Sequence, residues 1–179
     1  MNAMTHTITL DKFHTVYISV GSNLGDRLEN CRQGMAALDA LDSVHVEFIS
    51  RYYFTEPMDY TDQPWFVNAA ARIRTRLGPA ELLAELKSLE AAYGRKDTGV
   101  RFGPRPLDFD IIFLDDRVID IPDLIVPHPR MHLREFVLRP ICDLAPEMVH
   151  PVLKKTIREL LYALKSSGQS CIPVEALAN

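Results

Sequence analysis

One stretch of the sequence decides the fold: Thr15-Val16-Tyr17-Ile18-Ser19-Val20, which ends at the breaker cluster Gly21-Ser22-Asn23. β-branched and aromatic residues in such a run indicate a strand, and the cluster after them indicates the turn that closes it. Asp26 is a good N-cap and Glu29 follows three residues later, so a helix is predicted to begin here. The chain therefore opens with a strand that turns directly into a helix.

The same kinds of pattern continue along the chain. Residues 44–54 are predicted to form one long strand, and residues 66–75 another. Pro79 opens a second helix that ends at Gly94, and residues 108–114 form a further strand. A last helix begins at Thr156. The order β-α-β-β-α-β predicts an α+β fold, a ferredoxin-like sandwich with helices on one face of the sheet and added C-terminal strand and helix elements.

Composition and charge exclude several classes of function. Among the 179 residues, 20 Lys and Arg face 24 Asp and Glu, and this net charge of −4 gives no general footprint for nucleic acid or acidic membranes. The three cysteines, Cys31, Cys142 and Cys171, have no CxxC spacing, and free thiols suit a reducing cytosol. No stretch approaches the length of a membrane span, and the first ten residues do not resemble a signal peptide.

From these observations we expect a cytoplasmic protein that binds neither nucleic acid nor membranes. We also expect a monomer, although the sequence does not settle the oligomeric state. Its predicted organisation is a flexible leader in residues 1–13, a single domain in residues 14–165 and a C-terminal tail in residues 166–179.

Two carboxylates carry the strongest chemical signal. Asp108 and Asp110 close the stretch Arg101-Phe102-Gly103-Pro104-Arg105-Pro106-Leu107-Asp108-Phe109-Asp110. Because side chains alternate along a strand, the two carboxylates point the same way and repel each other unless a cation lies between them. Magnesium, which carboxylates and substrate phosphates hold together, is such a cation. An isolated D-x-D pattern is also common on a solvated polar face.

The residues just before this pair favour the metal interpretation. Four cations, Arg95, Lys96, Arg101 and Arg105, stand against the single Asp97 within residues 94–105. Arginines clamp phosphate oxygens in a fork geometry, and a metal neutralises the charge that develops on the phosphates. A basic loop that leads into paired carboxylates therefore indicates chemistry on a metal-bound polyphosphate.

Four further residues, in three places along the chain, are open to two interpretations. Glu90 falls within an apolar helical stripe, so its carboxylate either reaches out at the edge of the core or faces a cleft. Phe66 and Asn68 share one face of a strand, where a ring beside an amide suits a flat heterocycle, although an ordinary strand face could carry the same pair. His128, between Pro127 and Pro129, is a candidate ligand contact or a histidine that packs the loop.

Taken together, the motifs resemble the 6-hydroxymethyl-7,8-dihydropterin pyrophosphokinase family. The resemblance runs from about residue 16 to residue 151, and its pieces occur in the family's order. They are residues 17–26 (YISVGSNLGD), 53–57 (YFTEP), 62–68 (DQPWFVN), 101–112, 126–131 (VPHPRM) and 134–138 (REFVL). One such piece would be weak, whereas all of them in order are highly specific.

The resemblance implies an enzyme that moves the β,γ-pyrophosphate of ATP onto the pterin hydroxymethyl group in folate biosynthesis, with ATP binding before the pterin. It implies that Asp108 and Asp110 hold two magnesium ions, with Asp108 close to the reacting hydroxyl, and that Arg95 and Arg105 assist catalysis. The positions that match ATP contacts are Glu90, Arg105, Ile111, His128 and Arg134. Those that match the pterin pocket are Thr55, Pro57, Met58, Phe66, Asn68, Phe102 and Phe136.

A few positions depart from the family pattern. Phe109 replaces a residue that is usually aliphatic, Phe102 stands where some members carry tryptophan, and Lys87 and Asp97 differ from the usual polar residues. None of these changes removes a group that the chemistry requires.

Two other functions are compatible with the same order of elements. A non-catalytic module that senses a nucleotide or pterin would have no need of the paired aspartates. An RNA-binding sheet would call for exposed aromatic residues in basic surroundings, which the acidic total disfavours.

Overall fold

The computed structural model describes residues 13–95, 103–164 and 168–177. Its elements follow one another as β1 (His14–Ser22), α1 (Arg27–Asp39), β2 (Val44–Ile49), β3 (Tyr53–Thr55), β4 (Phe66–Thr75), α2 (Pro79–Ala92), β5 (Asp108–Leu114), β6 (Ile119–Ile121), β7 (Leu124–Val126), η1 (Met131–Leu133), α3 (Glu135–Leu144), α4 (Ile157–Leu164), β8 (Cys171–Pro173) and η2 (Val174–Leu177). The fold is α+β, as the sequence predicts.

An antiparallel sheet forms the middle of the molecule. Its strands lie in the order β5-β1-β4-β3-β8, and β2 pairs with β4 beside β3. β1 is the strand that reads TVYISV in the sequence, and it pairs with β4 along one edge and β5 along the other. The strands β6 and β7 form a separate small sheet.

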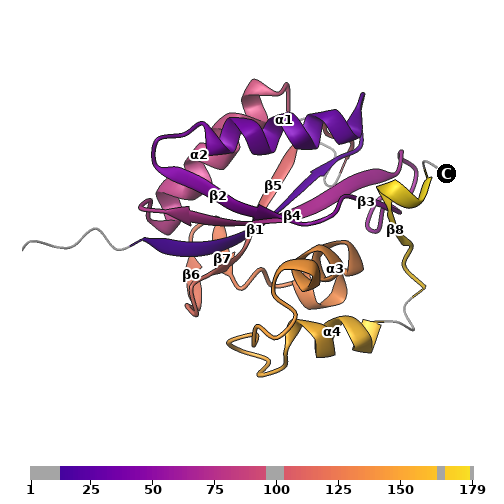
Figure 1. The fold of residues 1–179 in the computed structure, drawn as a ribbon. Helices are drawn as coiled ribbons and strands as arrows, with labels where there is room; N and C mark the ends of the chain where they lie inside the picture. The colour runs from indigo at the N-terminus through magenta and orange to yellow at the C-terminus, as the bar shows by residue number, and fades with distance from the viewer. Residues whose placement is uncertain (1–12, 96–102, 165–167, 178–179) are drawn as a thin grey trace, which may run out of the picture.

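Helices cover both faces of the sheet, so the expectation of helices on one face is wrong. Figure 1 shows α1 and α2 on one side, and α3 with α4 beyond it on the other. Each face has its own core: Val16, Ile18 and Val20 of β1 face the α1 side. Tyr17 and other apolar side chains face α3. The second face is apolar as well, and α3 has to cover it to remove that surface from water.

The predicted long strand over residues 44–54 is divided into β2 and β3. Pairing with β4 stops at Ile49, opposite Ala71, and resumes at Tyr53, opposite Asn68. Four steps along one strand therefore match three along the other, and the extra residue forms a bulge. Ser50 occupies this place: its Oγ accepts a hydrogen bond from the Ala70 backbone N–H at 2.9 Å, where a strand would offer a carbonyl.

Several local predictions are confirmed. Asp26 caps α1 and accepts a hydrogen bond from the Glu29 N–H. Gly94, with φ of 84°, follows the end of α2. Thr156 and Glu159 form the reciprocal capping box before α4. Local hydrogen bonds of this kind depend on neighbouring residues alone, so the sequence is sufficient to predict them.

The segment predicted as a C-terminal tail includes a strand of the sheet. β8 pairs antiparallel with β3, with Cys171 opposite Thr55. Just before it, the Gln169 side chain accepts a hydrogen bond from the Glu135 N–H at the start of α3, at 2.8 Å. Residues 168–173 thus join the sheet to the first turn of α3.

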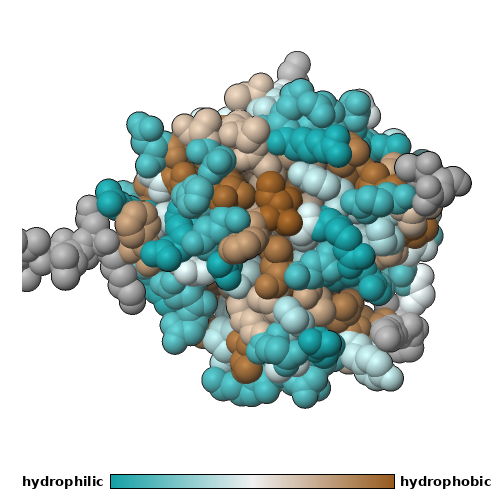
Figure 2. Space-filling model, viewed as in Figure 1, coloured by the Kyte–Doolittle hydropathy of each residue, from teal (hydrophilic) through white to brown (hydrophobic). Residues whose placement is uncertain are grey.

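The surface of the protein is more hydrophilic than its core. Figure 2 shows a face that is largely hydrophilic, with hydrophobic residues gathered near its middle, at the level of the sheet. Within the described parts of the chain, no helix combines the length and the apolar character needed to cross a bilayer.

Gly34 is where α1 approaches the segment that precedes β5. A Cβ at this position would lie 2.7 Å from Cδ1 of the fully buried Leu107. We expect Gly34→Leu to lower the free energy of unfolding by about 1–3 kcal/mol, because an overpacked core shifts its neighbours. Urea unfolding measures the change, and Ala36→Leu, at an exposed site on the same helix, is the control. Equal stability of the two variants would contradict this packing.

Candidate active site

A pocket opens on the face of the sheet where β5, β1, β4 and β3 lie side by side. The register places Asp108 opposite Gly21 and Asp110 opposite Ser19. Gly21 is also opposite Asn68 of β4, and a Cβ on Gly21 would lie 2.5 Å from the Asn68 Oδ1. Only glycine leaves room for this amide. Ser19 and Gly21, the small residues of β1, therefore form the floor of the pocket between the two aspartates and the Asn68 amide.

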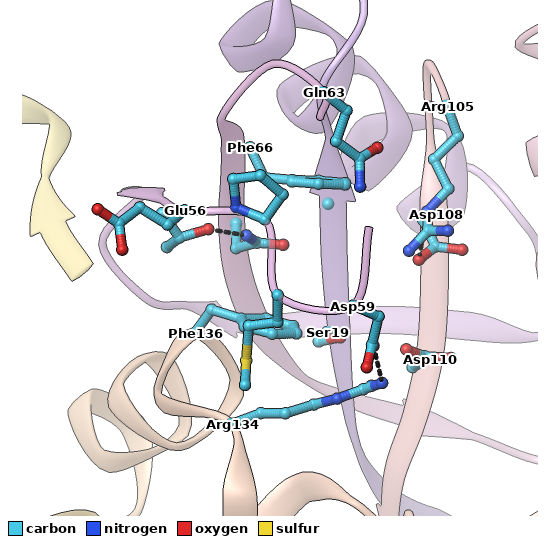
Figure 3. Close-up of a pocket in the computed structure, with 15 residues that line it drawn as sticks. Ser19, Glu56, Asp59, Gln63, Phe66, Arg105, Asp108, Asp110, Arg134 and Phe136 are labelled. Carbon is cyan, nitrogen blue, oxygen red and sulfur yellow. Dashed lines mark hydrogen bonds and ion pairs between the residues drawn. The ribbon is translucent and has the colours of Figure 1, made fainter. Parts of the chain in front are cut away.

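The pocket brings together ten residues that the sequence predicts for the site. They are Thr55, Pro57, Met58, Phe66, Asn68, Arg105, Asp108, Asp110, Arg134 and Phe136. These side chains come from separate parts of the chain, and Figure 3 shows Phe66 and Phe136 on one side of the opening and Asp108 and Asp110 on the other.

The aromatic end combines two rings with a fixed amide. Phe66 comes from β4 and Phe136 from α3, and both line the pocket. The Asn68 Nδ2 donates a hydrogen bond to the Thr55 Oγ1 at 2.6 Å, which holds the side-chain amide of this buried residue in one orientation. Rings and an oriented amide are suited to hold a flat, hydrogen-bonding bicycle.

At the charged end, the Asp108 carboxylate is already paired with two arginines. The Arg105 Nε lies 2.9 Å from the Asp108 Oδ2, and the Arg95 Nη1 lies 2.5 Å from the Asp108 Oδ1. The same Arg95 nitrogen lies 2.5 Å from Glu90. These arginines are therefore held close to the paired aspartates, where they could contact an anion beside them.

Asp110 lies in an environment that disfavours its charged form. Burial and the nearby Asp108 carboxylate raise the pKa of Asp110 well above its ordinary value, while Arg134 and Arg105 oppose the shift. A hard divalent cation between Asp108 and Asp110 would relieve the repulsion, and carboxylate oxygens are the ligands that Mg²⁺ prefers. The two residues therefore fit a magnesium site.

Arg134 is a buried cation with unused hydrogen-bonding capacity. Its Nε is buried and has no hydrogen-bond partner among the described residues. Burial and the charge of Arg130 lower the pKa of Arg134, although the guanidinium remains charged. An anion in the pocket would stabilise the charged Arg134 guanidinium and accept a hydrogen bond from its Nε.

Of the described residues predicted for the site, four lie outside the lining of the pocket: Arg95, which pairs with Asp108 as described above, and Glu90, Ile111 and His128. Glu90 is buried between α2 and β5, where its Oε1 accepts a hydrogen bond from the Phe109 N–H at 2.6 Å. The Ile111 side chain belongs to the core. The His128 N–H donates to the Ile112 carbonyl oxygen at 3.0 Å. Phe102 lies outside the described residues, so its pterin-binding role stays a prediction, as do the catalytic role of Arg95 and the ATP-binding roles of Glu90, Ile111 and His128.

The pocket also contains residues that the sequence interpretation missed: Ser19, Gly21, Glu56, Asp59 and Gln63. Alternation along residues 15–21 places Ser19 and Gly21 on the face opposite Val16, Ile18 and Val20, and this signal could have identified both.

Asn23 is another missed residue, and it joins the two ends of the pocket. Its Oδ1 accepts a hydrogen bond from the Arg105 N–H at 2.7 Å, and its Nδ2 donates to the Gln63 Oε1 at 2.9 Å. Because Asn23 is almost fully buried, these bonds fix the loop that carries Arg105 relative to the loop that carries Gln63.

The chain is similar to several known proteins. The family model described as 7,8-dihydro-6-hydroxymethylpterin-pyrophosphokinase (HPPK) matches residues 17–146. The 2-amino-4-hydroxy-6-hydroxymethyldihydropteridine pyrophosphokinase of Pseudomonas aeruginosa is 37% identical over 158 residues, which cover 88% of this chain and 96% of that protein. A triple mutant of the Plasmodium falciparum HPPK-DHPS has the same fold, with a TM-score of 0.69 over 88% of this chain and 45% of that chain, at 16% identity.

Several relatives are much longer than this chain. The folic acid synthesis protein fol1 of Schizosaccharomyces pombe is 39% identical over 91% of this chain, which spans 22% of that protein. The mitochondrial folate synthesis bifunctional protein of Arabidopsis thaliana is 47% identical over 73% of this chain, which spans 23% of it.

His128 generates a prediction about stability and pH. Burial and the charge of Arg134 lower the pKa of His128 from 6.5 to about 4. The unfolded chain therefore binds a proton at a higher pH than the folded protein, and stability is lost as the pH falls from 6.5 toward 4. We expect His128→Gln to lose less unfolding free energy than the wild type over this interval, as measured by urea unfolding. Identical pH profiles would show that His128 is not held in its neutral form.

Proposed function

Because the chain belongs to the 7,8-dihydro-6-hydroxymethylpterin-pyrophosphokinase family, we propose that it transfers the β,γ-pyrophosphate of ATP to 6-hydroxymethyl-7,8-dihydropterin. The products are the pterin diphosphate and AMP, in a step of folate biosynthesis. One observation carries the proposal: a single pocket has two aromatic rings and an oriented amide at one end, and paired carboxylates with arginines at the other. The two ends match the two substrates.

The aromatic end is the proposed pterin site. Phe66 and Phe136 stack on the bicycle, and Asn68, oriented by Thr55, hydrogen-bonds its edge. Pro57 and Met58 complete the wall. We include Phe102 in this site because the family resemblance implies it.

The charged end is the proposed site for the ATP phosphates. Arg105 and Arg134 line it, and Arg95 is held beside it by Asp108. In the proposal these guanidiniums exchange carboxylate partners for phosphate oxygens when ATP binds. The family resemblance extends the nucleotide site to Glu90, Ile111 and His128.

Asp108 and Asp110 would hold magnesium, two ions according to the resemblance. When bound, the metal supplies charge neutralisation on the phosphates. The chain's own residues orient the pterin hydroxyl toward the β-phosphorus. A bond forms between the hydroxyl oxygen and this phosphorus, the bond to the oxygen of the leaving AMP breaks, and the hydroxyl proton is released to solvent. Positioning and electrostatic stabilisation supply most of the catalysis in such a transfer.

We propose the finer structural and cellular properties with the following support. The strand order β5-β1-β4, with β2 and β3 beside β4, supports a ferredoxin-like description. The three unpaired cysteines suit a reducing cytoplasm. The monomeric state and the domain division remain predictions from the sequence.

The proposed reaction predicts that AMP forms from ATP and Mg²⁺ only when 6-hydroxymethyl-7,8-dihydropterin is present. A chelator should abolish AMP formation, and added Mg²⁺ should restore it. Chromatography of the nucleotides measures the product. ATP binding without pterin-dependent AMP would instead favour a sensing module.

The same assay tests the metal assignment. We expect Asp110→Ala to reduce pterin-dependent AMP formation at least about a hundredfold, because the phosphates lose charge stabilisation at the reacting centre. The fold should persist, since Asp110 lies in the pocket and outside both cores. Asp120→Ala, at an exposed position in β6, is the matched control. Near-normal turnover by Asp110→Ala would refute the assignment.

A further inference from the structure

Asp59 bridges two arginines at the charged end of the pocket. Its Oδ1 pairs with the Arg130 Nη2, and its Oδ2 lies 3.4 Å from the Arg134 Nη2. Figure 3 shows the Asp59 carboxylate pointing toward Arg134. The hydrogen bond from Arg130 and the two arginine charges hold the pKa of Asp59 below its ordinary value. This carboxylate is therefore an anion that already lies where ATP phosphates are proposed to bind.

The contact with Asp59 leaves part of the hydrogen-bonding capacity of Arg134 unused. A guanidinium offers five donors, yet the contact with Asp59 is a single one at 3.4 Å, and the buried Nε has no hydrogen-bond partner among the described residues. A triphosphate carries more negative charge and more acceptor oxygens than one carboxylate. It should therefore compete effectively for the same donors.

Asp59 differs from the other carboxylates that pair with arginines here. Asp108 stands beside Asp110 on β5, and in the proposed function a metal ion would hold both carboxylates once Arg95 and Arg105 bind phosphate in place of Asp108. Asp59 lies in the connection between β3 and β4, and its salt bridges are with Arg130 and Arg134. Phosphate at these arginines would repel Asp59, because like charges cannot share one set of donors.

The connection that carries Asp59 is also a wall of the proposed pterin site. Residues 56–63 supply Glu56, Pro57, Met58 and Gln63 to the pocket. The Asp59 contacts therefore tie this wall to arginines 71 and 75 residues further along the chain. Displacing Asp59 would release the wall from them.

We propose that Asp59 is an internal competitor of the ATP triphosphate for Arg130 and Arg134, and that its displacement couples nucleotide binding to the pterin wall. The inference rests on the proposed function, in which Arg134 contacts ATP. Asp59 thereby lowers the affinity of the empty enzyme for ATP. Only the nucleotide-free state makes the contacts of Asp59 with the two arginines. Their loss when ATP binds therefore changes the pterin site.

Calorimetric titration of the full chain with Mg²⁺ and a non-hydrolysable ATP analogue tests the competition. We expect Asp59→Asn to tighten analogue binding at least about fivefold. Asp62→Asn removes the same charge from an exposed position in the same connection and should change affinity less than about twofold. Arg134→Gln should weaken binding, and the gain from Asp59→Asn should shrink in that background, as expected for residues in contact.

A second measurement follows the coupling. The affinity for 6-hydroxymethylpterin, read by its fluorescence, is determined with and without the ATP analogue. The ratio of the two affinities should move toward one in Asp59→Asn, because the contact that ATP breaks is already absent. Thermal unfolding of each variant verifies that the fold is retained.

The outcomes separate the inference from the proposed function. If Arg134→Gln weakens analogue binding but Asp59→Asn leaves it unchanged or weaker, the competitor role is wrong and the phosphate site stands. If Asp62→Asn raised the affinity for the ATP analogue equally, the effect would come from net charge alone, and this too would overturn the inference. If Arg134→Gln leaves analogue binding unchanged, the phosphate assignment itself fails, and the inference fails with it.

Discussion

β1 pairs with β5 along one edge and with β4 along the other, and the position of every group on the pocket floor depends on this register. The pairing sets Asp108 and Asp110 beside Gly21 and Ser19, with Asn68 on the far side of Gly21. Because side chains alternate across a strand, a slip of one residue would turn Val20 into the pocket and bury Ser19 in the core. The apolar residues of β1 therefore fix the place of the polar ones.

Charge balance is the second constraint on the site. Ion pairs join Arg95 and Arg105 to Asp108, and Arg130 and Arg134 to Asp59. Charges withdrawn from water are stable only when they are paired, so a pocket that awaits a charged substrate has to supply temporary partners of its own. In the proposed function, ATP binding is an exchange of ion-pair partners, and the strength of the internal ion pairs sets part of the affinity for ATP. Asp108 and Asp59 differ in this respect, because the proposed function gives Asp108 a metal ion as its new partner and gives Asp59 none.

The two ends of the pocket are also mechanically connected. Asn23 hydrogen-bonds both the Arg105 loop and Gln63, while Gln169 joins the segment before β8 to the first turn of α3. Phe136 lies in that same turn. Movements of the loops around the pocket are thus constrained by a few buried or partly buried polar contacts, which are worth more in a low dielectric than on the surface.

Local signals in the sequence predicted most of the elements, and the errors have physical causes. The strand 108–114 and the start of α1 were predictable because alternation and capping involve neighbouring residues. The division of residues 44–54 was not, because the Ser50 Oγ replaces a strand carbonyl only once β4 lies opposite. α3 was missed because Pro140 lies inside it, and helix interiors normally exclude proline. Without α3, the second layer of helices could not be foreseen.

The sequence by itself determined the family, the α+β class, the paired carboxylates and most of the residues that line the pocket, because motifs and periodicity are local properties of the chain. Tertiary structure alone decided that helices cover both faces of the sheet, that Glu90 is buried against β5, and that Asp59 meets Arg130 and Arg134 across 71 and 75 residues. Which distant charges become neighbours depends on how the strands pair and where the connections between them close. Neither spacing nor composition contains that information.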